Sequence, residues 1–296
     1  MKRALTRAAL TVGILVVVLL AAAWTTHRAW APGMIVAAPY PEGIPAQAPR
    51  GVDHEVDVVR TGAHVRAWVF DPTGQPRGTV LMLHGIHDGK LRLVAGARHH
   101  AARGYRTVVV DSRGHGESSG AFLTYGVEES RDLVAMVDEL ARRKLLAGPL
   151  AVIGSSYGAA TALQHAALDA RVDKVVALAP FASLRQVVGA YIEWLLGPPA
   201  RLIPAPVVDD LVDDCARQAG FDPDRACPRC AAPQIRAAVL LIHSRDDERI
   251  PWQHSVEIHG ALTSRKKLVL VDGVNHADVG RGTRVGQEIR QWLDAR

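Results

Sequence analysis

The stretch Gly154–Gly158 reads G-S-S-Y-G and carries the residue best placed for nucleophilic chemistry, Ser156. It follows the apolar run Leu150–Ile153 and precedes the alanine-rich segment Ala159–Leu168, which is typical of a helix. This order predicts a sharp strand-to-helix turn that exposes a serine hydroxyl at the top of a sheet. Glycine on both sides of such a turn removes side chains that would otherwise collide.

A serine hydroxyl is a weak nucleophile at neutral pH, so it needs a base, and the base needs an orienting carboxylate. Two later loops offer these groups. Asp247 follows Ala238–Ile242, which is typical of a buried strand. His276 comes in the loop after the last such run, Lys267–Val271. We expect His276 to take the Ser156 proton and Asp247 to hold the other ring N–H.

Acyl transfer also needs two N–H donors for the oxyanion that forms. One donor is expected from Tyr157, the residue after the serine. The other is expected from Ile86, in the loop after the predicted strand Thr79–Leu83. The neighbouring His84 is interpreted as a structural residue of that loop.

These features resemble the α/β-hydrolase superfamily of serine hydrolases. A further match is the run D-S-R-G-H-G-E-S at Asp111–Ser118, in which Asp111 and Arg113 are expected to fix the loop. The segments Thr124–Gly126 and Ala179–Leu184 are similar to the membrane-anchored BEM46-like branch. The resemblance covers residues 52–296 and implies a fold and a nucleophilic mechanism, but no particular substrate.

Asp246 competes with Asp247 for the role of the acid. Asp247 is favoured because its spacing to Ile250 and Pro251 resembles the D-x-x-[VI]-P run of these enzymes. Asp246 is then expected to cap the loop or to lie in solvent.

Strand and helix patterns alternate along the rest of the chain, after an antiparallel hairpin in Asp53–Phe70. This alternation predicts an α/β fold: a doubly wound, mostly parallel sheet with helices on both faces. A long insertion, about residues 181–236, interrupts the pattern on the active-site side and is expected to form a small helical lid. Tyr191 and Trp194 in this lid could line an acyl-binding pocket or could simply pack the lid onto the body.

The cysteines Cys215, Cys227 and Cys230 all lie in this insertion. Three thiols without a fourth ligand make a zinc site a poor interpretation. Outside the cytoplasm we expect a disulfide from Cys215 to Cys227 or Cys230.

The first 28 residues differ from the rest of the chain in their charge and apolar character. A basic start is followed by an apolar, uncharged run, residues 8–24, near the short end of the length that can span a bilayer. This pattern predicts a signal-anchor with the catalytic domain on the extracytoplasmic side, and a cleaved secretory signal is the alternative. The proline-rich residues 29–51 are expected to form an extended linker that holds residues 52–296 off the membrane.

Composition narrows the function classes. The net charge is only +5, and no basic run is interleaved with aromatic residues, so a nucleic-acid partner is not expected. No phosphate-binding glycine motif occurs, and neither a cofactor nor a metal is expected. The prediction is a serine hydrolase acting on a small-molecule or lipid-like carboxylic ester or thioester. The alternatives are a peptidase or acyltransferase with the same residues, and a catalytically silent, membrane-anchored interaction protein.

Overall fold

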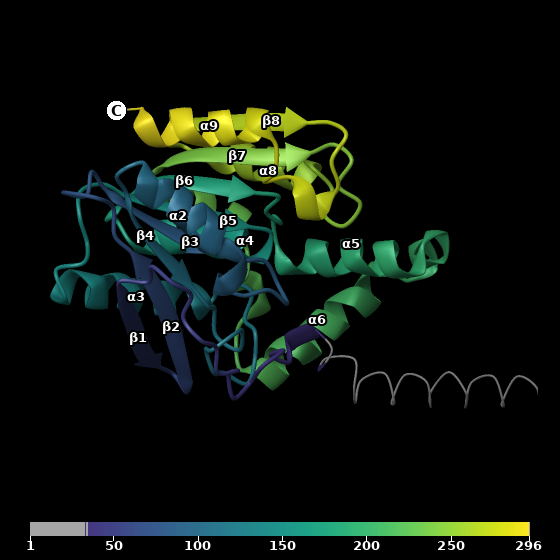
Figure 1. The fold of residues 1–296 in the computed structure, drawn as a ribbon. Coiled ribbons are helices and arrows are strands. Elements are labelled where there is room, and N and C mark those ends of the chain that lie inside the picture. Colours follow the sequence, from purple (N-terminus) through teal and green to yellow (C-terminus); the bar gives the residue numbers. More distant parts are fainter. Residues whose placement is uncertain (1–32, 34, 296) are drawn as a thin grey trace, which may run out of the picture.

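The computed structural model describes residues 33 and 35–295 of the 296-residue chain. Within these residues, an eight-stranded sheet runs in the order β1-β2-β4-β3-β5-β6-β7-β8 (Figure 1). The first two strands form the predicted hairpin, β2 pairs antiparallel with β4, and all later neighbours are parallel. The strands are β1 (His54–Arg60), β2 (Ala63–Phe70), β3 (Thr79–Leu83), β4 (Arg106–Val110), β5 (Leu150–Ser155), β6 (Val172–Leu178), β7 (Ala238–Ser244) and β8 (Lys266–Val271).

The central strands are apolar along their whole length because helices cover both faces of the sheet. All five residues of β3 are buried, as expected for a parallel strand between two layers. The edge strand β1 instead carries charged, exposed residues, which discourage pairing with another chain. The predicted doubly wound α/β fold is therefore confirmed.

The helices form two layers and a separate lid. The main helices are α2 (Val94–Ala102), α3 (Glu129–Arg142), α4 (Tyr157–Leu168), α5 (Leu184–Leu196), α6 (Ala205–Ala219), α7 (Pro228–Ala231), α8 (Gln253–Ala261) and α9 (Thr283–Asp294). Short 3-10 turns are η1 (Lys90–Leu93), η2 (Pro198–Leu202), η3 (Pro223–Arg225), η4 (Ala232–Gln234) and η5 (His276–Asp278). One core cluster joins α3, α4 and α8 to one face of the sheet, and a second joins α2 and α9 to the other face.

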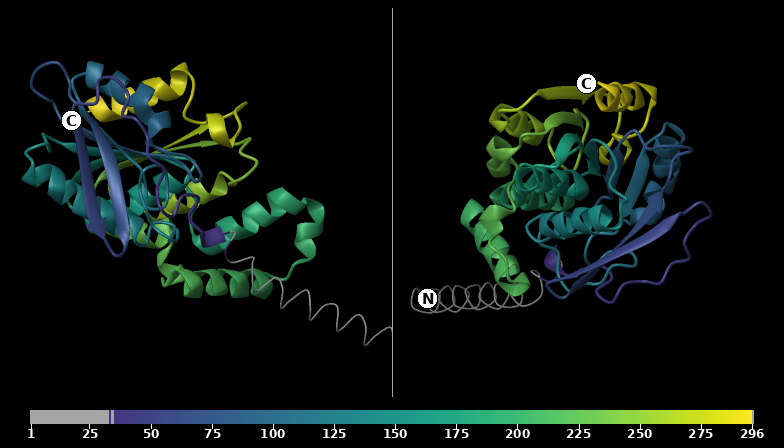
Figure 2. Two further views of the ribbon diagram at one scale, coloured as in Figure 1. Left: turned by 60° about the horizontal axis from the view of Figure 1, so that its bottom comes forward. Right: turned by 90° about the vertical axis from the view of Figure 1, so that its left-hand side faces the viewer.

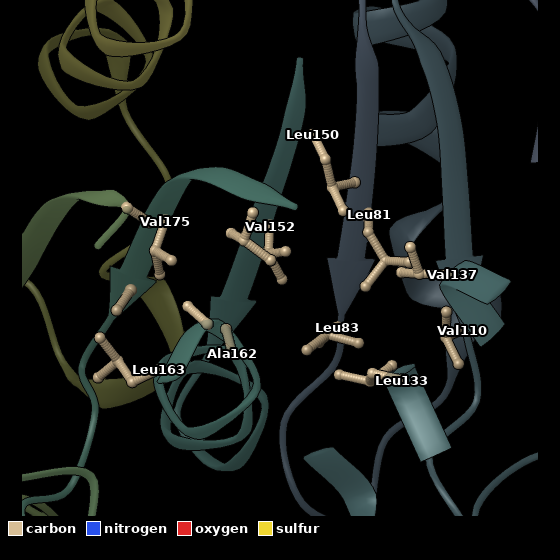
Figure 3. Packing of buried hydrophobic residues seen from close by; sticks show 14 of the residues in the cluster. Leu81, Leu83, Val110, Leu133, Val137, Leu150, Val152, Ala162, Leu163 and Val175 are labelled. Carbon is tan, nitrogen blue, oxygen red and sulfur yellow. The ribbon is translucent and has the colours of Figure 1, made fainter. Parts of the chain in front are cut away.

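Figure 3 shows the first of these clusters at close range. Leu81 and Val152, on neighbouring strands, lie on the face of the sheet that is covered by Leu133 of α3 and Leu163 of α4. Burying side chains of this size stabilises a fold by about 1.5–3 kcal/mol each relative to leaving them in water. The strand that leads into Ser156 is therefore held rigidly between the two layers.

The predicted insertion forms a helical lid made of α5, η2, α6, η3, α7 and η4. Figures 1 and 2 show α5 and α6 standing away from the sheet, at its carboxyl edge. A third core cluster holds the lid to the body, and it includes Tyr157 and Ala160 of α4 beside Leu184 and Val188 of α5.

Part of the predicted linker, residues 29–51, packs against this body. Val36 is fully buried in the third core cluster, and Ala37 forms a bridge with Phe122. Backbone N–H groups of Tyr40 and Ile44 donate to the carbonyls of Gly114 and Gly116. The described part of this stretch is therefore not a free spacer, because its apolar side chains fill the junction between lid and body.

The disulfide pairing differs from the expectation. Cys227 is bonded to Cys230, whereas the sequence analysis expected a bond from Cys215 to one of them. Pro228 starts the single turn of α7, which brings Cys230 back beside Cys227, and the Cys230 N–H lies 3.2 Å from Cys227 Sγ. Cys215 is buried in α6 and contributes to the third core cluster, outside this bond.

The predicted signal-anchor, residues 1–28, lies outside the described residues. Among residues 33 and 35–295, none of the helices combines the length and apolar character needed to cross a bilayer.

Candidate active site

The three predicted catalytic side chains lie together at the carboxyl edge of the sheet. Ser156 lies between β5 and α4, Asp247 lies in the loop after β7, and His276 begins η5 after β8. Since parallel strands end at the same edge, loops far apart in sequence meet there. His276 Nε2 is 2.9 Å from Ser156 Oγ, and His276 Nδ1 is 2.6 Å from Asp247 Oδ2.

The turn at Ser156 is sharp, as the sequence predicted, and its backbone is strained. Ser156 has φ 53° and ψ −115°, a conformation that L-residues rarely adopt and that costs about 1–3 kcal/mol. A Cβ on Gly154 would lie 2.2 Å from the Gly158 carbonyl oxygen, and a Cβ on Gly158 would lie 2.4 Å from the His84 oxygen. Only glycine fits at both positions, because backbone atoms occupy the space.

The hydrogen bonds settle which tautomer His276 adopts. Nδ1 faces a carboxylate, which can only accept, so Nδ1 carries the proton. Nε2 is then free to accept from the Ser156 hydroxyl. This is the arrangement in which a histidine can act as a general base toward serine.

The side chain of Asp247 is fully buried, yet it is held in its charged form. Burial raises its pKa, but hydrogen bonds from His243 and His276 outweigh burial and bring the pKa well below the ordinary range. Asp247 Oδ1 also accepts from the backbone N–H groups of Arg249 and Ile250, at 3.0 and 2.9 Å. The carboxylate therefore remains ionised over the working range of most enzymes.

His243 is a neighbour of Asp247 to which the sequence analysis assigned no role. Its Nε2 lies 2.9 Å from the Ile250 carbonyl oxygen and 3.2 Å from Asp247 Oδ2, so this nitrogen must carry a proton. Its Nδ1 lies 2.7 Å from Ser255 Oγ. The signal in the sequence that could have indicated a special environment is a histidine directly after the apolar run Ala238–Ile242, within β7.

Asp246 and Glu248 flank the acid without replacing it. Asp246 Oδ2 accepts from the Gly273 N–H at 2.6 Å, which fastens the Asp247 loop to the loop that carries His276. Glu248 Oε2 lies 3.2 Å from the His276 backbone nitrogen. Asp246 thus caps the loop, as the sequence analysis expected of the competing carboxylate.

The two predicted oxyanion donors lie in the loop after β3 and at the first turn of α4. Neither the Ile86 N–H nor the Tyr157 N–H has a hydrogen-bond acceptor among the residues that the structure describes. Tyr157 is the first residue of α4, where the helix dipole adds positive potential. Both groups are therefore available to a developing negative charge.

His84 fastens the Ile86 loop, in agreement with its expected structural role. Its Nδ1 donates to the Gly85 carbonyl at 2.7 Å, and its Nε2 accepts from the Ser112 N–H at 3.0 Å. Burial lowers the pKa of His84, so the neutral ring matches this pair of bonds.

Asp111 and Arg113 also fix loops, as expected. Arg113 forms a bidentate pair with the buried Asp132 at 2.7 Å, which ties the loop after β4 to α3. Asp111 accepts from both the backbone and the side chain of Lys90, a buried lysine whose ammonium also contacts the Trp68 ring. The sequence gives no sign that Lys90 is special, because a buried lysine is indistinguishable from an exposed one in the sequence.

Tyr191 and Trp194, the predicted pocket residues, lie on α5 next to the Asp247 loop. The two rings are in edge contact at 5.9 Å, and the Arg249 guanidinium lies 5.0 Å from the Trp194 ring centroid. Trp194 is 42% exposed, so its ring is only partly covered by its neighbours.

The sheet order, the elbow at Ser156 and the helical lid define the α/β-hydrolase fold. Residues 74–229, more than half of the chain, match the family model described as Serine aminopeptidase, S33 (Hydrolase_4), and the chain belongs to this family of serine hydrolases. The matched segment contains Ser156, whereas Asp247 and His276 lie beyond it.

Individual proteins are similar to this chain in sequence or in fold. The chain is 25% identical over 218 residues to the uncharacterized protein YqkD of Bacillus subtilis (strain 168), covering 73% of this chain and 70% of YqkD. The Pyrococcus furiosus esterase Pf2001 is structurally similar, with a TM-score of 0.68 at 20% identity, over 88% of this chain and 99% of the esterase. The Pyrococcus horikoshii acylaminoacyl peptidase has a TM-score of 0.62 at 18% identity, over 81% of this chain and 40% of the peptidase. At these identities the two solved structures demonstrate a shared fold.

Proposed function

We propose that this chain hydrolyses carboxylic esters or thioesters through an acyl-enzyme on Ser156. The observation that carries the proposal is the unbroken hydrogen-bond chain from Asp247 through His276 to Ser156 Oγ, at 2.6 and 2.9 Å. A catalytically silent protein would have no need to keep this arrangement on a strained turn. The interaction-protein alternative is therefore the weaker one.

In the first half of the reaction, Ser156 Oγ attacks the carbonyl carbon while its proton passes to His276 Nε2. The oxyanion accepts hydrogen bonds from the Tyr157 and Ile86 N–H groups. Asp247 stabilises the imidazolium across the 2.6 Å contact with Nδ1. When the carbonyl re-forms, the bond to the leaving group breaks, and His276 gives its proton to the departing alcohol or thiol.

In the second half, His276 takes a proton from a water molecule that attacks the acyl-serine. The second tetrahedral intermediate collapses, the carboxylic acid leaves, and the proton returns from His276 to Ser156. Every proton in this cycle passes through the same ring nitrogen. The residues named here supply each step without a cofactor.

A peptidase or acyltransferase using the same residues is the second candidate, because the matching family is described as a serine aminopeptidase family. The same acyl-enzyme would then form from an amide, or would be released by an alcohol or amine instead of water. Cleavage of an anilide with the same acyl group would identify a peptidase, and transfer of that acyl group to an added alcohol or amine would identify an acyltransferase.

Tyr191 and Trp194 are proposed to line the acyl-binding side of the site. The proposal is supported by the position of both rings beside Arg249, which follows Asp247 by two residues. Trp194→Ala should shift the preferred acyl length. Identical rates across acyl lengths in the variant and the wild type would count against this role.

The chain is also proposed to be attached to a membrane through residues 8–24, with the catalytic domain on the extracytoplasmic side. This fits the similarity of its sequence to the BEM46-like branch, which is likewise a proposal. Fractionation of cells that produce the full chain, with protease protection of the catalytic domain, would test both location and orientation.

The hydrolase proposal is tested by initial rates on p-nitrophenyl esters of increasing acyl length. We expect measurable turnover by the wild type and a fall of at least about 10⁴-fold in kcat for Ser156→Ala. Ser155→Ala is the matched control, because the neighbouring hydroxyl has no part in the mechanism. Equal rates for wild type and Ser156→Ala would reject the proposal.

A further inference from the structure

The outer end of the lid exposes an apolar surface. We call Leu195, Leu196 and Leu202 the lid tip; they end α5 and η2, and their exposed fractions are 67%, 57% and 85%. Trp194 adjoins them, and Arg201 is the only charged residue from Trp194 to Pro204. Such a cluster on a projecting element is costly in water and indicates a binding surface.

The described chain starts at the same end of the molecule. Ile35 and Val36 belong to the cluster that contains Leu184 and Val188 of α5 and Leu211 of α6. The Tyr125 hydroxyl donates to the Ile35 carbonyl at 2.7 Å. Figures 1 and 2 show these first residues, in purple, beside α6.

The tether between this point and the apolar N-terminal run is short. Residues 25–34 separate the run from Ile35, and ten residues span at most about 33–36 Å when fully extended. The 13 residues of α5 already reach about 20 Å from the body toward the tip. If residues 8–24 lie in a bilayer, the lid end of the body is therefore within reach of its surface.

We propose that the lid tip is a membrane contact, whose leucines seat in the interfacial layer of the lipid bilayer to which the chain is attached. This inference rests on the proposed membrane attachment and on the proposed hydrolysis of lipid-like esters. Leucine and tryptophan with one flanking arginine are the side chains that such an interface favours. A second copy of the chain is the other possible occupant.

The contact would have a consequence for the substrate. α5 runs from the lid tip back to Leu184, which follows the end of β6 close to Ser156. Tyr191 and Trp194 lie along this path, and Arg249 links Trp194 to the Asp247 loop. An ester dissolved in the bilayer would thus pass Tyr191 and Trp194 on its way to the nucleophile, whereas a small water-soluble ester would not depend on the lid tip.

The test uses the full chain reconstituted in phosphatidylcholine vesicles, with an environment-sensitive fluorophore on Leu202→Cys. The matched control carries it on Val59→Cys, because Val59 is 74% exposed but lies on the edge strand β1. Labelling is selective, since Cys227 and Cys230 are bonded to each other and Cys215 is buried. Lipids with a quencher on the acyl chain report contact with the bilayer.

We expect quenching at position 202 and none at position 59. Water-like emission without quenching at position 202 would overturn the proposal. Emission typical of a fluorophore shielded from water, but without quenching by the lipid, would also overturn the proposal. A second protein copy would then cover the lid tip.

Rate measurements distinguish a failure of the proposed membrane contact from a failure of the proposed hydrolase function. The triple variant Leu195→Ser, Leu196→Ser, Leu202→Ser should hydrolyse a vesicle-embedded ester about tenfold more slowly, with its rate on a soluble short-chain ester unchanged. The control Val59→Ser, Leu168→Ser should change neither rate. A wild type without any ester hydrolysis would reject the proposed function, while the quenching result would still decide the membrane contact.

Discussion

At the residue scale, a buried carboxylate keeps its charge because four groups are directed at it. Asp247 receives N–H groups from Arg249 and Ile250 and is flanked by the rings of His243 and His276. Burial alone would favour the neutral acid, so these partners decide the protonation state. The same contacts fix the direction in which the carboxylate faces His276.

Asp247→Asn should lower kcat by about 10⁴-fold while leaving the fold intact, because an amide cannot stabilise the imidazolium and can favour the wrong tautomer. The measurement is the rate of ester hydrolysis, with circular dichroism to show that the variant is folded. Asp246→Asn is the matched control and should stay within about threefold of wild type, since its role is to accept the Gly273 N–H. The reverse order of the two effects would mean that Asp246 is the acid.

At the scale of elements, the elbow between β5 and α4 depends on close backbone contact. Gly154→Ala should abolish activity and lower stability by more than about 2 kcal/mol, because the added methyl would lie 2.2 Å from the Gly158 oxygen. Gly189→Ala in α5 is the control: its Cβ meets nothing within 4 Å, and alanine should stabilise that helix by roughly 0.5–1 kcal/mol. Thermal unfolding of both variants checks this. A Gly154→Ala variant with wild-type stability would contradict the account of the turn.

The elements that hold the site could be predicted from the sequence because their signals are local. The apolar runs before Ser156, Asp247 and His276 mark buried strands, and chain order alone places these residues at one edge of a parallel sheet. The disulfide could not be predicted correctly, because the choice among Cys215, Cys227 and Cys230 depends on where α6 and α7 come to lie. The docking of Val36 was missed for the same reason: a proline-rich stretch reads as extended whether or not it packs.

At the scale of the whole molecule, buried histidines make stability depend on pH. Burial lowers the pKa of His100, His165 and His254 to about 4 and that of His115 to about 3. In the unfolded chain the same rings titrate near pH 6.5, so the unfolded state binds protons first as the pH falls. The stability contributed by these neutral rings is therefore complete above about pH 6.5 and is lost progressively toward pH 4.

We predict that the free energy of unfolding falls by about 1 kcal/mol for each of these histidines between pH 7 and pH 5.5. Urea unfolding at several pH values measures how the free energy of unfolding changes with pH. His100→Gln should remove about 1 kcal/mol of this fall, because it removes one such ring, and His100 is the least buried of the four. A free energy of unfolding that is constant from pH 7 to pH 5.5 would contradict this assignment of neutral rings.

Ser156 is predicted to be an activated nucleophile, and every catalytic step proposed above depends on it. The most direct measurement is labelling of the full chain with a fluorophosphonate probe, beside Ser156→Ala and Asp247→Asn, with the modified peptide identified by mass spectrometry. We predict that the wild type is labelled on Ser156, that Ser156→Ala is not labelled, and that Asp247→Asn reacts far more slowly. A folded wild type that stays unlabelled, or labelling that persists in Ser156→Ala, would contradict the claim.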